Sequence, residues 1–347
     1  MFFQKMLRPQ IRKGCVPKFQ MNGALMSHFT TTTSAPVWGD KRYYSFDYYL
    51  KNTFGEKIYR LSLNGGMTCP NRDGTLGSRG CIFCSAGGSG DFAAAPTLSV
   101  TSQIEEAKKQ VAAKSHCRKF VAYFQAYTNT YAPIEHLRKI FTEAICHPDI
   151  VALSIATRCD CLSEEILDLL EQLNQIKPVW IELGLQTIHA ESLRYIRSGF
   201  TLEQYTHAVA ALHDRNLMVI THLILGLPGE TAEMMRASVS YVASLPVWGI
   251  KLQLLHILNG TDLGAEYEKN PFSLFSLEEY CNLVADCIAL LPPDMVVHRI
   301  TGDGPRRLLM APLWSTDKKR VLNTIHKTLK DRDLWQGKNC YNNPTQK

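Results

Sequence analysis

The sequence lacks a long apolar run and, from residue 40 onward, any clear excess of charge of one sign. No stretch approaches the ~20 consecutive apolar residues that cross a bilayer, so no membrane role is expected. Of the 38 Lys and Arg residues, five precede the first acid, Asp40, which leaves 33 bases against 32 acids in the rest of the chain. Net charge therefore gives little support for nucleic-acid binding, which would have to rest on a local patch or a family resemblance.

Before residue 40 the sequence has no acidic residue and no clear amphipathic helix. Its five bases and the run Thr-Thr-Thr-Thr-Ser at 30–34 are typical of a transit peptide, which would make the protein organellar. A flexible basic leader over 1–39, or an upstream start with the true one at Met21 or Met26, explains the same composition. We favour the leader and expect a cytoplasmic protein.

The eleven cysteines do not predict disulfides, because their number is odd and no secretory segment precedes them. A reduced compartment is the simpler interpretation. Most of these thiols are then expected to be small core side chains.

From residue 57 onward, short β-branched or aromatic runs alternate with longer helical patterns, which predicts βαβ units around a parallel sheet. The expected strands are 57–63, 120–124, 151–157, 179–185, 217–225 and 250–257. The expected helices are 102–115, 133–147, 163–175, 202–215 and 230–243. Six units fall short of the eight that complete a barrel, so the expected fold class is α/β, a partial (β/α)6 barrel of the TIM type.

A further helix at 277–291, a strand near 295–300 and a basic helix at about 317–331 follow the sixth unit. They are expected to form a C-terminal α/β extension that can cover the open side of the barrel. No repeat, long linker or low-complexity tract divides the body of the chain. The predicted organisation is a leader at 1–39, one catalytic barrel at 40–292 and the extension at 293–347.

Three cysteines come directly after the first expected strand, where a parallel barrel has its active site. Eleven residues separate Cys69 from Cys81, and two separate Cys81 from Cys84. A 4Fe-4S cluster is normally held by four thiolates, so three thiolates without a close fourth ligand leave one iron open to another molecule. A structural zinc ion would need a fourth ligand, and unligated thiols are the remaining alternative. The pattern favours the cluster.

Phe83, just before the last of these cysteines, and four longer segments carry a resemblance to a known family. The segments are Cys-Pro-Asn-Arg-Asp-Gly-Thr at 69–75, Gly-Gly-Ser-Gly-Asp-Phe-Ala at 87–93, Phe-Gln-Ala-Tyr-Thr-Asn-Thr-Tyr-Ala-Pro at 124–133 and Glu-Leu-Gly-Leu-Gln-Thr at 182–187. From about residue 41 to 337 the sequence resembles the bacterial radical S-adenosylmethionine (radical SAM) proteins related to the Elongator catalytic subunit. Its spacing of eleven residues departs from the three that are commoner in radical SAM enzymes.

This resemblance implies an enzyme in which Cys69, Cys81 and Cys84 hold a 4Fe-4S cluster whose open iron binds S-adenosylmethionine (SAM). One electron, from a donor such as flavodoxin or ferredoxin, splits SAM into methionine and a 5′-deoxyadenosyl radical that takes a hydrogen from the substrate. Relatives are implicated in remodelling the 5-substituent of the wobble uridine of tRNA, from carboxymethylaminomethyl-uridine to aminomethyl-uridine. A small metabolite as the substrate, or a zinc-stabilised RNA-binding protein, are the alternatives.

The same resemblance places candidate SAM contacts at the ends of later strands. Gln125, Tyr127 and Thr128 follow the second strand, where related enzymes often have a Gly-rich segment facing the methionyl amine; a polar loop that caps the next helix is the alternative. Glu182 and Gln186 bracket the end of the fourth strand, and Gln186 resembles the residue that binds SAM carboxylate or ribose. Burying such groups without partners costs ~2–7 kcal/mol, so a bound cofactor or a structural hydrogen bond is expected there.

Two further residues extend this set. Arg158 ends the third strand, and its guanidinium can grip a SAM carboxylate. His222, in the fifth strand, is placed near the SAM ribose or base, or is a satisfied core histidine. Cys159 and Cys161 are alternatives as extra ligands or redox thiols, although one intervening residue makes it hard for them to clamp one metal. Relatives commonly have an Asn-Arg pair near 197–198, where this chain has Arg197 and Ser198. Arg197 would therefore contact SAM from a shifted position, or that contact is missing.

One basic and aromatic concentration lies near the C-terminal end of the body. It comprises His298, Arg299, Arg306, Arg307, Lys318, Lys319 and Arg320, with Trp314 and Trp335. Phosphate contacts and stacked bases use these residue types. A solvated helix face is the alternative, which composition alone favours.

Overall fold

The computed structural model describes residues 35–88, 97–112, 117–302 and 304–340, which belong to one compact unit. Most of the predicted leader, the segment 89–93 of the family resemblance and Asp303 lie outside the described residues. Among the residues described, no helix has the length and apolar character that a membrane span needs.

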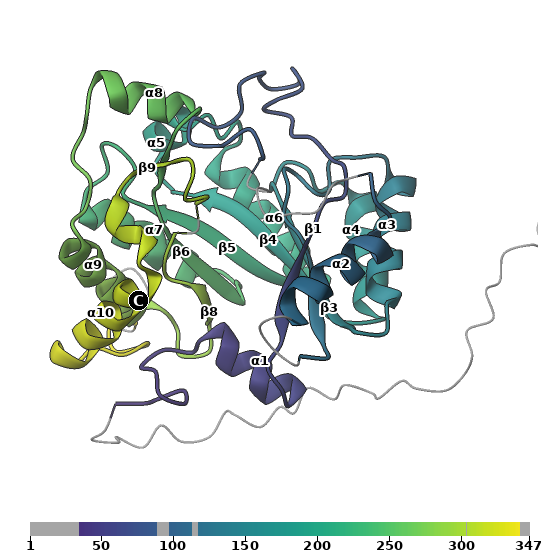
Figure 1. Cartoon of the computed structure of the whole chain (residues 1–347), viewed down its shortest axis with the longest axis horizontal. Helices are drawn as coiled ribbons and strands as arrows, with labels where there is room; N and C mark the ends of the chain where they lie inside the picture. Colours follow the sequence, from purple (N-terminus) through teal and green to yellow (C-terminus); the bar gives the residue numbers. More distant parts are fainter. Residues whose placement is uncertain (1–34, 89–96, 113–116, 303, 341–347) are drawn as a thin grey trace, which may run out of the picture. The chain divides into compact units, whose positions relative to one another are not determined.

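Seven parallel strands form the central sheet, and Figure 1 shows them side by side. In spatial order they are β1 (Tyr59–Leu63), β2 (Phe120–Phe124), β3 (Ile150–Thr157), β4 (Val179–Gln186), β5 (Met218–Leu225), β6 (Gly249–Leu254) and β8 (Val296–Arg299). Each strand pairs with the one that precedes it in this order, so the sheet winds in one direction and curls into an open half-barrel. The α/β partial-barrel class predicted from the sequence is confirmed.

Helices of the βαβ units cover the outer face of this sheet because each has one apolar side. They are α2 (Val100–Ala112), α3 (Ile134–Cys146), α4 (Glu164–Asn174), α6 (Leu202–Asp214) and α7 (Ala232–Ala243). In α3, for example, the buried residues Leu137, Ile140, Phe141 and Ala144 recur at helical spacing. Thr201 closes the start of α6 with a capping box, which satisfies backbone N–H groups that the helix itself leaves without partners.

The strand expected near 295–300 joins the barrel sheet as β8 and does not stand apart from it. Gly249 and Ile250 of β6 pair with Val296 and Val297, and both valines are buried. The barrel therefore has seven strands where the sequence predicted six. The division of the chain at 292/293 remains a prediction.

The rest of the C-terminal part packs on the barrel from outside. Helix α9 (Leu277–Leu290) contacts α7 and α10 (Lys318–Asp331). The short strand β9 (Leu309–Ala311) pairs antiparallel with β7 (Ile257–Leu258), which follows β6. This pairing brings the segment after β8 back to the end of the barrel at which the strands finish.

Helix α1 (Phe46–Phe54), which the sequence analysis did not predict, closes the opposite end of the barrel, where the strands begin. Phe46 and Leu50 pack against Trp180 and Ile220 in a small core separate from the main one. We call this cluster, together with Val121, Ala152 and Val296, the apolar plug. Figure 1 shows α1 at the far end of the sheet from α5 (Ala190–Tyr195) and α8 (Asp262–Lys269). The plug leaves the other end as the one that can receive ligands.

Candidate active site

The three cysteines lie in a loop that is folded by its own backbone. The N–H of Arg72 donates to the carbonyl of Cys69 at 2.8 Å, and that of Cys84 to the carbonyl of Cys81 at 3.0 Å. Gly80 has φ +75°, and a Cβ there would lie 2.9 Å from Nε of Arg72. Glycine is therefore required at this turn, because a side chain would be strained and would also displace the arginine.

Cys69, Cys81 and Cys84 line one cavity at the end of the barrel where the strands finish. Asn71 anchors their loop: its Nδ2 donates to the carbonyl of Arg197 at 2.7 Å and to Sγ of Cys81 at 3.4 Å. Burial raises the pKa of Cys81 to about 11. A thiolate at this position therefore needs nearby positive charge, and a metal centre supplies it.

The same cavity is lined by seven of the residues that the sequence analysis selected for SAM. These are Gln125, Tyr127, Thr128, Arg158, Glu182, Gln186 and His222. They lie within or just beyond four neighbouring strands, β2 to β5, so sheet register is what brings them together. Their individual contacts with SAM remain predictions.

Backbone strain is concentrated around this cavity. Tyr127, Gln186 and Arg197 are non-glycine residues with φ of 59°, 71° and 59°. At Gln186 the register between β4 and β5 shifts, and its buried Oε1 has no hydrogen-bond partner among the described residues. Such strain and such an unsatisfied acceptor are typical of ligand sites, so Gln186 fits a hydrogen-bond donor of SAM.

Tyr127 fastens the cysteine loop to the end of β2. Its N–H donates to the carbonyl of Gly88 at 2.8 Å, and its hydroxyl donates to the carbonyl of Ala86 at 2.7 Å. A Cβ at Gly88 would collide with the tyrosine ring. The position of the Tyr127 ring therefore requires glycine at 88. Tyr127 positions the loop in addition to lining the cavity.

Two arginines that the sequence analysis placed near SAM are engaged within the chain. Arg158 donates to both carboxylate oxygens of Asp160, at 2.9 and 2.7 Å, so its bidentate face is already used. Arg197 pairs with Asp262 at the start of α8, at 2.5 Å, and Asp262 also binds Arg79 at 2.6 Å. Arg197 therefore ties the cysteine loop to α8, and its side chain is not among those lining the cavity.

Cys159 and Cys161 line a second cavity, with Leu162 and Gly199, and not the first. Burial raises the pKa of both thiols to about 12. The structure therefore does not favour them as extra ligands or as reactive thiolates.

Below the residues predicted to contact SAM, a buried polar network crosses the barrel. Glu182 accepts from Ser154 at 2.8 Å and Arg60 at 3.3 Å through Oε1, and from His222 at 2.8 Å and Lys251 through Oε2. Burial alone would raise the pKa of Glu182, but Lys251 and His222 hold it well below its usual range. Glu182 thus has a full set of protein partners.

Two further residues complete this layer, which we call the polar floor. Tyr123 lies beneath Lys251, with Nζ 5.0 Å from the ring centroid, and Arg299 lines the cavity from β8. The polar floor comprises Arg60, Tyr123, Ser154, Glu182, His222, Lys251 and Arg299. Sequence analysis missed Lys251, although its signal is visible: Lys251 and Gln253 alternate with apolar residues in β6, so both face the interior.

The basic and aromatic concentration predicted near the C-terminus divides in the structure. His298 is buried in the barrel interior and stacks on Phe46, with ring centroids 4.1 Å apart, while Arg299 belongs to the polar floor. Trp314 is half-buried, and its Nε1 donates to the carbonyl of Phe275 at 3.0 Å. The exposed basic residues are Arg306, Arg307, Lys318, Lys319 and Arg320, which we call the basic strip.

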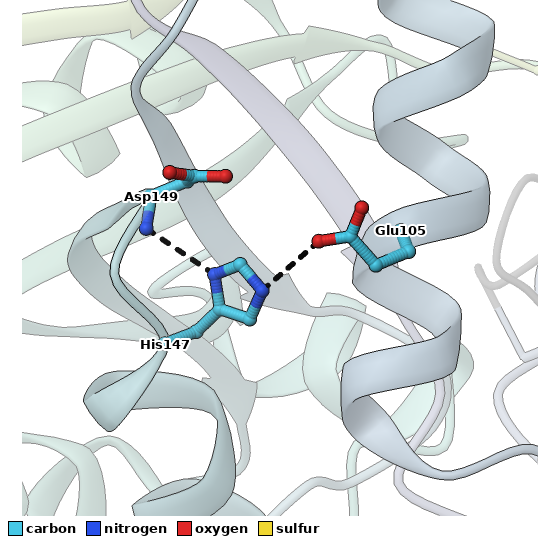
Figure 2. Close-up of side chains that lie close together, drawn as sticks. All are labelled: Glu105, His147 and Asp149. Atoms are coloured by element: carbon cyan, nitrogen blue, oxygen red, sulfur yellow. Dashed lines mark hydrogen bonds and ion pairs between the residues drawn. The ribbon is translucent and has the colours of Figure 1, made fainter.

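Glu105, His147 and Asp149 form a separate group of close potential metal ligands, which Figure 2 shows. The N–H of Asp149 donates to Nδ1 of His147 at 3.2 Å, so Nε2 carries the proton and donates to Glu105 at 3.1 Å. Lys108 contacts both carboxylates, at 2.8 and 2.5 Å. An ammonium already neutralises this group and no imidazole lone pair is free, so it is a structural ion-pair cluster.

Comparison with known proteins shows which family has this fold. The sequence profile of the Radical SAM superfamily matches residues 74–242, and that of the radical SAM C-terminal domain matches residues 247–331. The Bacillus subtilis protein YtqA is 44% identical over 299 residues, covering 86% of this chain and 93% of YtqA. The chain belongs to the radical SAM superfamily. As a radical SAM enzyme it uses a 4Fe-4S cluster and SAM, which replaces the alternative of a zinc-stabilised module.

More distant radical SAM relatives include proteins named for tRNA. The tRNA uridine(34) acetyltransferase of Methanocaldococcus jannaschii is 27% identical over 163 residues, covering 46% of this chain and 30% of that protein. The structure of Methanocaldococcus infernus Elp3 superposes with a TM-score of 0.61 at 18% identity, covering 80% of this chain and 63% of the other. The expected relation to the Elongator catalytic subunit is confirmed, and the Elp3 structure shows the shared fold.

Proposed function

We propose that this radical SAM enzyme acts on tRNA, at the 5-substituent of the wobble uridine, with electrons from a flavodoxin or ferredoxin. The observation that carries the proposal is one cavity lined by three thiols and by seven residues suited to SAM, whose rim continues into exposed basic residues. The relation to a protein named tRNA uridine(34) acetyltransferase supports the choice of substrate.

The position of the basic strip also supports an RNA substrate. Pro305 lines the cavity, and the next residues, Arg306 and Arg307, are exposed. Arg306 donates to the carbonyl of Thr316 at 2.6 Å, which holds this loop against the start of α10. Lys318, Lys319 and Arg320 follow there at the surface. A phosphate backbone lying on the strip would deliver a nearby base to the cavity rim.

The residues of this chain have separable tasks in such an enzyme. Cys69, Cys81 and Cys84 would hold the cluster, and Tyr127 keeps their loop on β2. Gln186 would accept a hydrogen bond from SAM. Bound together, the cluster and SAM supply one-electron cleavage of the sulfonium and abstraction of a hydrogen atom. The apolar plug excludes water from beneath, which protects a reactive radical from side reactions.

Mass spectrometry of nucleosides from the tRNA of wild-type and deletion strains tests this proposal. We expect the deletion strain to accumulate carboxymethylaminomethyl-uridine and to lose aminomethyl-uridine at the wobble position. A plasmid carrying the wild-type gene should restore the profile, whereas the Cys81→Ser variant should not. Identical wobble-uridine profiles in the two strains would remove the tRNA assignment and favour a small metabolite.

Binding of the purified protein to tRNA provides a second test. Replacing Arg307, Lys319 and Arg320 with glutamine should weaken tRNA binding and reduce its dependence on salt by about one phosphate contact per residue. The triple variant Lys51→Gln, Lys57→Gln and Lys109→Gln, which removes the same charge elsewhere, is the matched control. Equal salt dependence in both triple variants would contradict a role for the basic strip.

A further inference from the structure

The side of α10 that faces away from the barrel carries a row of basic residues. Val321, Ile325 and Leu329 are buried on the opposite side, where α10 packs against α9. The outward side exposes Lys319, Arg320, Asn323, Lys327 and Lys330, which we call the basic face. From Arg320 onward these residues are three or four positions apart, so they form a continuous row along the helix.

Few carboxylates balance the charge of the basic face. Asp331 pairs with Lys327, and Asp317 at the start of the helix accepts the backbone N–H of Arg320 at 3.0 Å. Lys319, Arg320 and Lys330 have no acidic partner among the residues that the structure describes. Four basic side chains therefore adjoin two acidic ones, and this excess favours a partner that carries negative charge.

The basic face continues the basic strip away from the cavity. Pro305 lines the cavity, and the next residue, Arg306, donates to the carbonyl of Thr316 just before α10. From Arg320, which belongs to both the strip and the face, the helix rises by about 15 Å to Lys330, at 1.5 Å per residue. Figure 1 shows α10 beside α9, extending away from β9. A partner that reaches both the cavity and Lys330 must therefore be extended along this surface.

The side chains of the basic face fit paired RNA better than an unpaired strand. Proteins that bind single strands stack the bases on aromatic side chains, which the basic face lacks. Duplex RNA is recognised through its phosphates and 2′-hydroxyl groups, which Lys, Arg and Asn side chains can contact. A duplex also holds its phosphates in a fixed array, so it binds a rigid helix without the entropy cost of ordering a flexible strand.

A membrane surface fits the basic face less well. An amphipathic helix binds lipid by burying its apolar side among the acyl chains. The apolar side of α10 is already buried against protein, so it is not available for this contact.

We propose that the basic face of α10 binds the double-stranded stem of the RNA substrate whose unpaired base enters the cavity. This inference rests on the proposed function and deepens it, because it makes a stem-loop, and not an unpaired strand, the form of RNA that the enzyme recognises. The basic strip contacts phosphates of the loop near the rim of the cavity, and Lys327 and Lys330 contact phosphates of the stem.

The test uses the protein loaded with cluster and SAM, and two RNAs of equal length and charge. One is an anticodon stem-loop, and the other has the same loop between arms that cannot pair. We expect wild-type protein to bind the stem-loop about tenfold more tightly. The double variant Lys327→Gln with Lys330→Gln should lose this preference and reduce the salt dependence of stem-loop binding by about two phosphate contacts. Its affinity for the unpaired RNA should change by less than about twofold.

The matched control is the double variant Lys51→Gln with Lys109→Gln. Lys51 forms an ion pair four residues away along its helix, as Lys327 does, and Lys109 is exposed on α2. This control should keep the preference for the stem-loop. All four substitutions are at the surface, so both double variants should unfold at the same temperature as the wild type.

The outcomes separate failure of this inference from failure of the tRNA assignment. A preference for the stem-loop that survives in the Lys327 and Lys330 variant overturns the proposal and leaves the basic face to solvent or to an acidic protein. If wild-type protein binds both RNAs equally, and the strip variant with Arg307, Lys319 and Arg320 replaced by glutamine weakens both, the tRNA assignment stands and the stem contact is wrong. If wild-type protein binds neither RNA, the proposed function and this inference fail together.

Photocrosslinking locates the stem independently of affinity. A photoreactive amino acid at position 330 should label nucleotides of the stem, whereas the same group at position 307 should label nucleotides of the loop. Labelling of the loop alone from both positions, or no labelling from position 330, would refute the stem contact.

Discussion

Asn71 illustrates how one side chain connects the cluster loop to the barrel. It is 4% exposed, and its amide bridges the carbonyl of Arg197 and the sulfur of Cys81. Hydrogen bonds to cluster sulfurs favour the more negative, reduced state, so this amide is placed to tune a redox centre. The residue lies in the Cys-Pro-Asn-Arg-Asp-Gly-Thr segment, but its partner at 197 is visible only in three dimensions.

The Asn71→Ala variant should still load iron, because all three thiols remain. We expect its cluster to have a lower reduction potential, and the fold to lose about 1–3 kcal/mol because the carbonyl of Arg197 loses its donor. An anaerobic redox titration followed by EPR measures the first effect, and urea unfolding measures the second. Asn52→Ala, at an exposed position, is the control. An unchanged potential would contradict the role assigned to the amide.

His222 predicts a pH dependence of stability with a defined sign. Burial lowers its pKa from 6.5 to about 4, so between these values the unfolded chain binds more protons than the folded chain. Stability therefore falls as the pH falls from 6.5 towards 4, by up to about 3 kcal/mol. His222→Asn retains a donor to Glu182 but does not titrate. Urea unfolding of both metal-free proteins should show the loss in the wild type relative to the variant, and parallel pH profiles would disprove it.

At the scale of secondary structure, α1 precedes the first strand but packs across the end of the barrel. Its aromatic side chains close the end of the barrel where the strands begin, with Phe46 lying edge-on to Trp180 at 5.4 Å between centroids. The ring of Phe46 also lies under the guanidinium of Arg60, at 5.1 Å. The apolar plug thus contacts the polar floor directly, so a substitution in the plug should also shift the side chains of the floor.

Phe46→Ala should therefore destabilise the protein by about 3–5 kcal/mol, the range for emptying a large buried site. Thermal or urea unfolding of the purified variant measures this loss. The exposed Lys51→Ala on the same helix should change stability by no more than about 0.5 kcal/mol. Comparable stability of the two variants would show that α1 does not plug the barrel.

At the scale of the whole molecule, the cavity is assembled from segments far apart in the chain. The cysteine loop follows β1, the residues predicted to contact SAM lie within or just beyond β2 to β5, and Lys251 and Arg299 come from β6 and β8. No smaller part of the barrel contains the complete site. Binding of the cluster and SAM should therefore stabilise the barrel as one unit.

Loading with cluster and SAM should raise the unfolding temperature of the barrel in a single cooperative transition. Anaerobic calorimetry of the loaded and metal-free proteins tests this expectation. In the Cys69→Ser, Cys81→Ser and Cys84→Ser variants the iron content should fall and the increase should disappear, whereas Cys146→Ser, at an exposed cysteine, should behave as wild type. If unfolding instead occurs in two transitions and loading raises the temperature of only one of them, the site belongs to a smaller folding unit.

The sequence by itself determined the alternation of strands and helices, and it selected the three cysteines that we propose as cluster ligands. Both signals are local: hydrophobic periodicity needs about ten residues, and Cys69 to Cys84 lie in one loop. The family resemblance also selected strand-end residues that the structure brings to one cavity. The resemblance did not predict that Arg158 donates to both carboxylate oxygens of the nearby Asp160.

Only the tertiary structure decided the polar floor, the apolar plug and the place of β8 in the sheet. Glu182 meets Arg60, Ser154 and Lys251 because four strands are staggered to particular registers, and register depends on the packing of the whole barrel. His298, which looked like part of a basic surface, is instead enclosed between Phe46 and Trp248. A local pattern predicts which residues of a strand face inward, but the register between strands decides which of those side chains become neighbours.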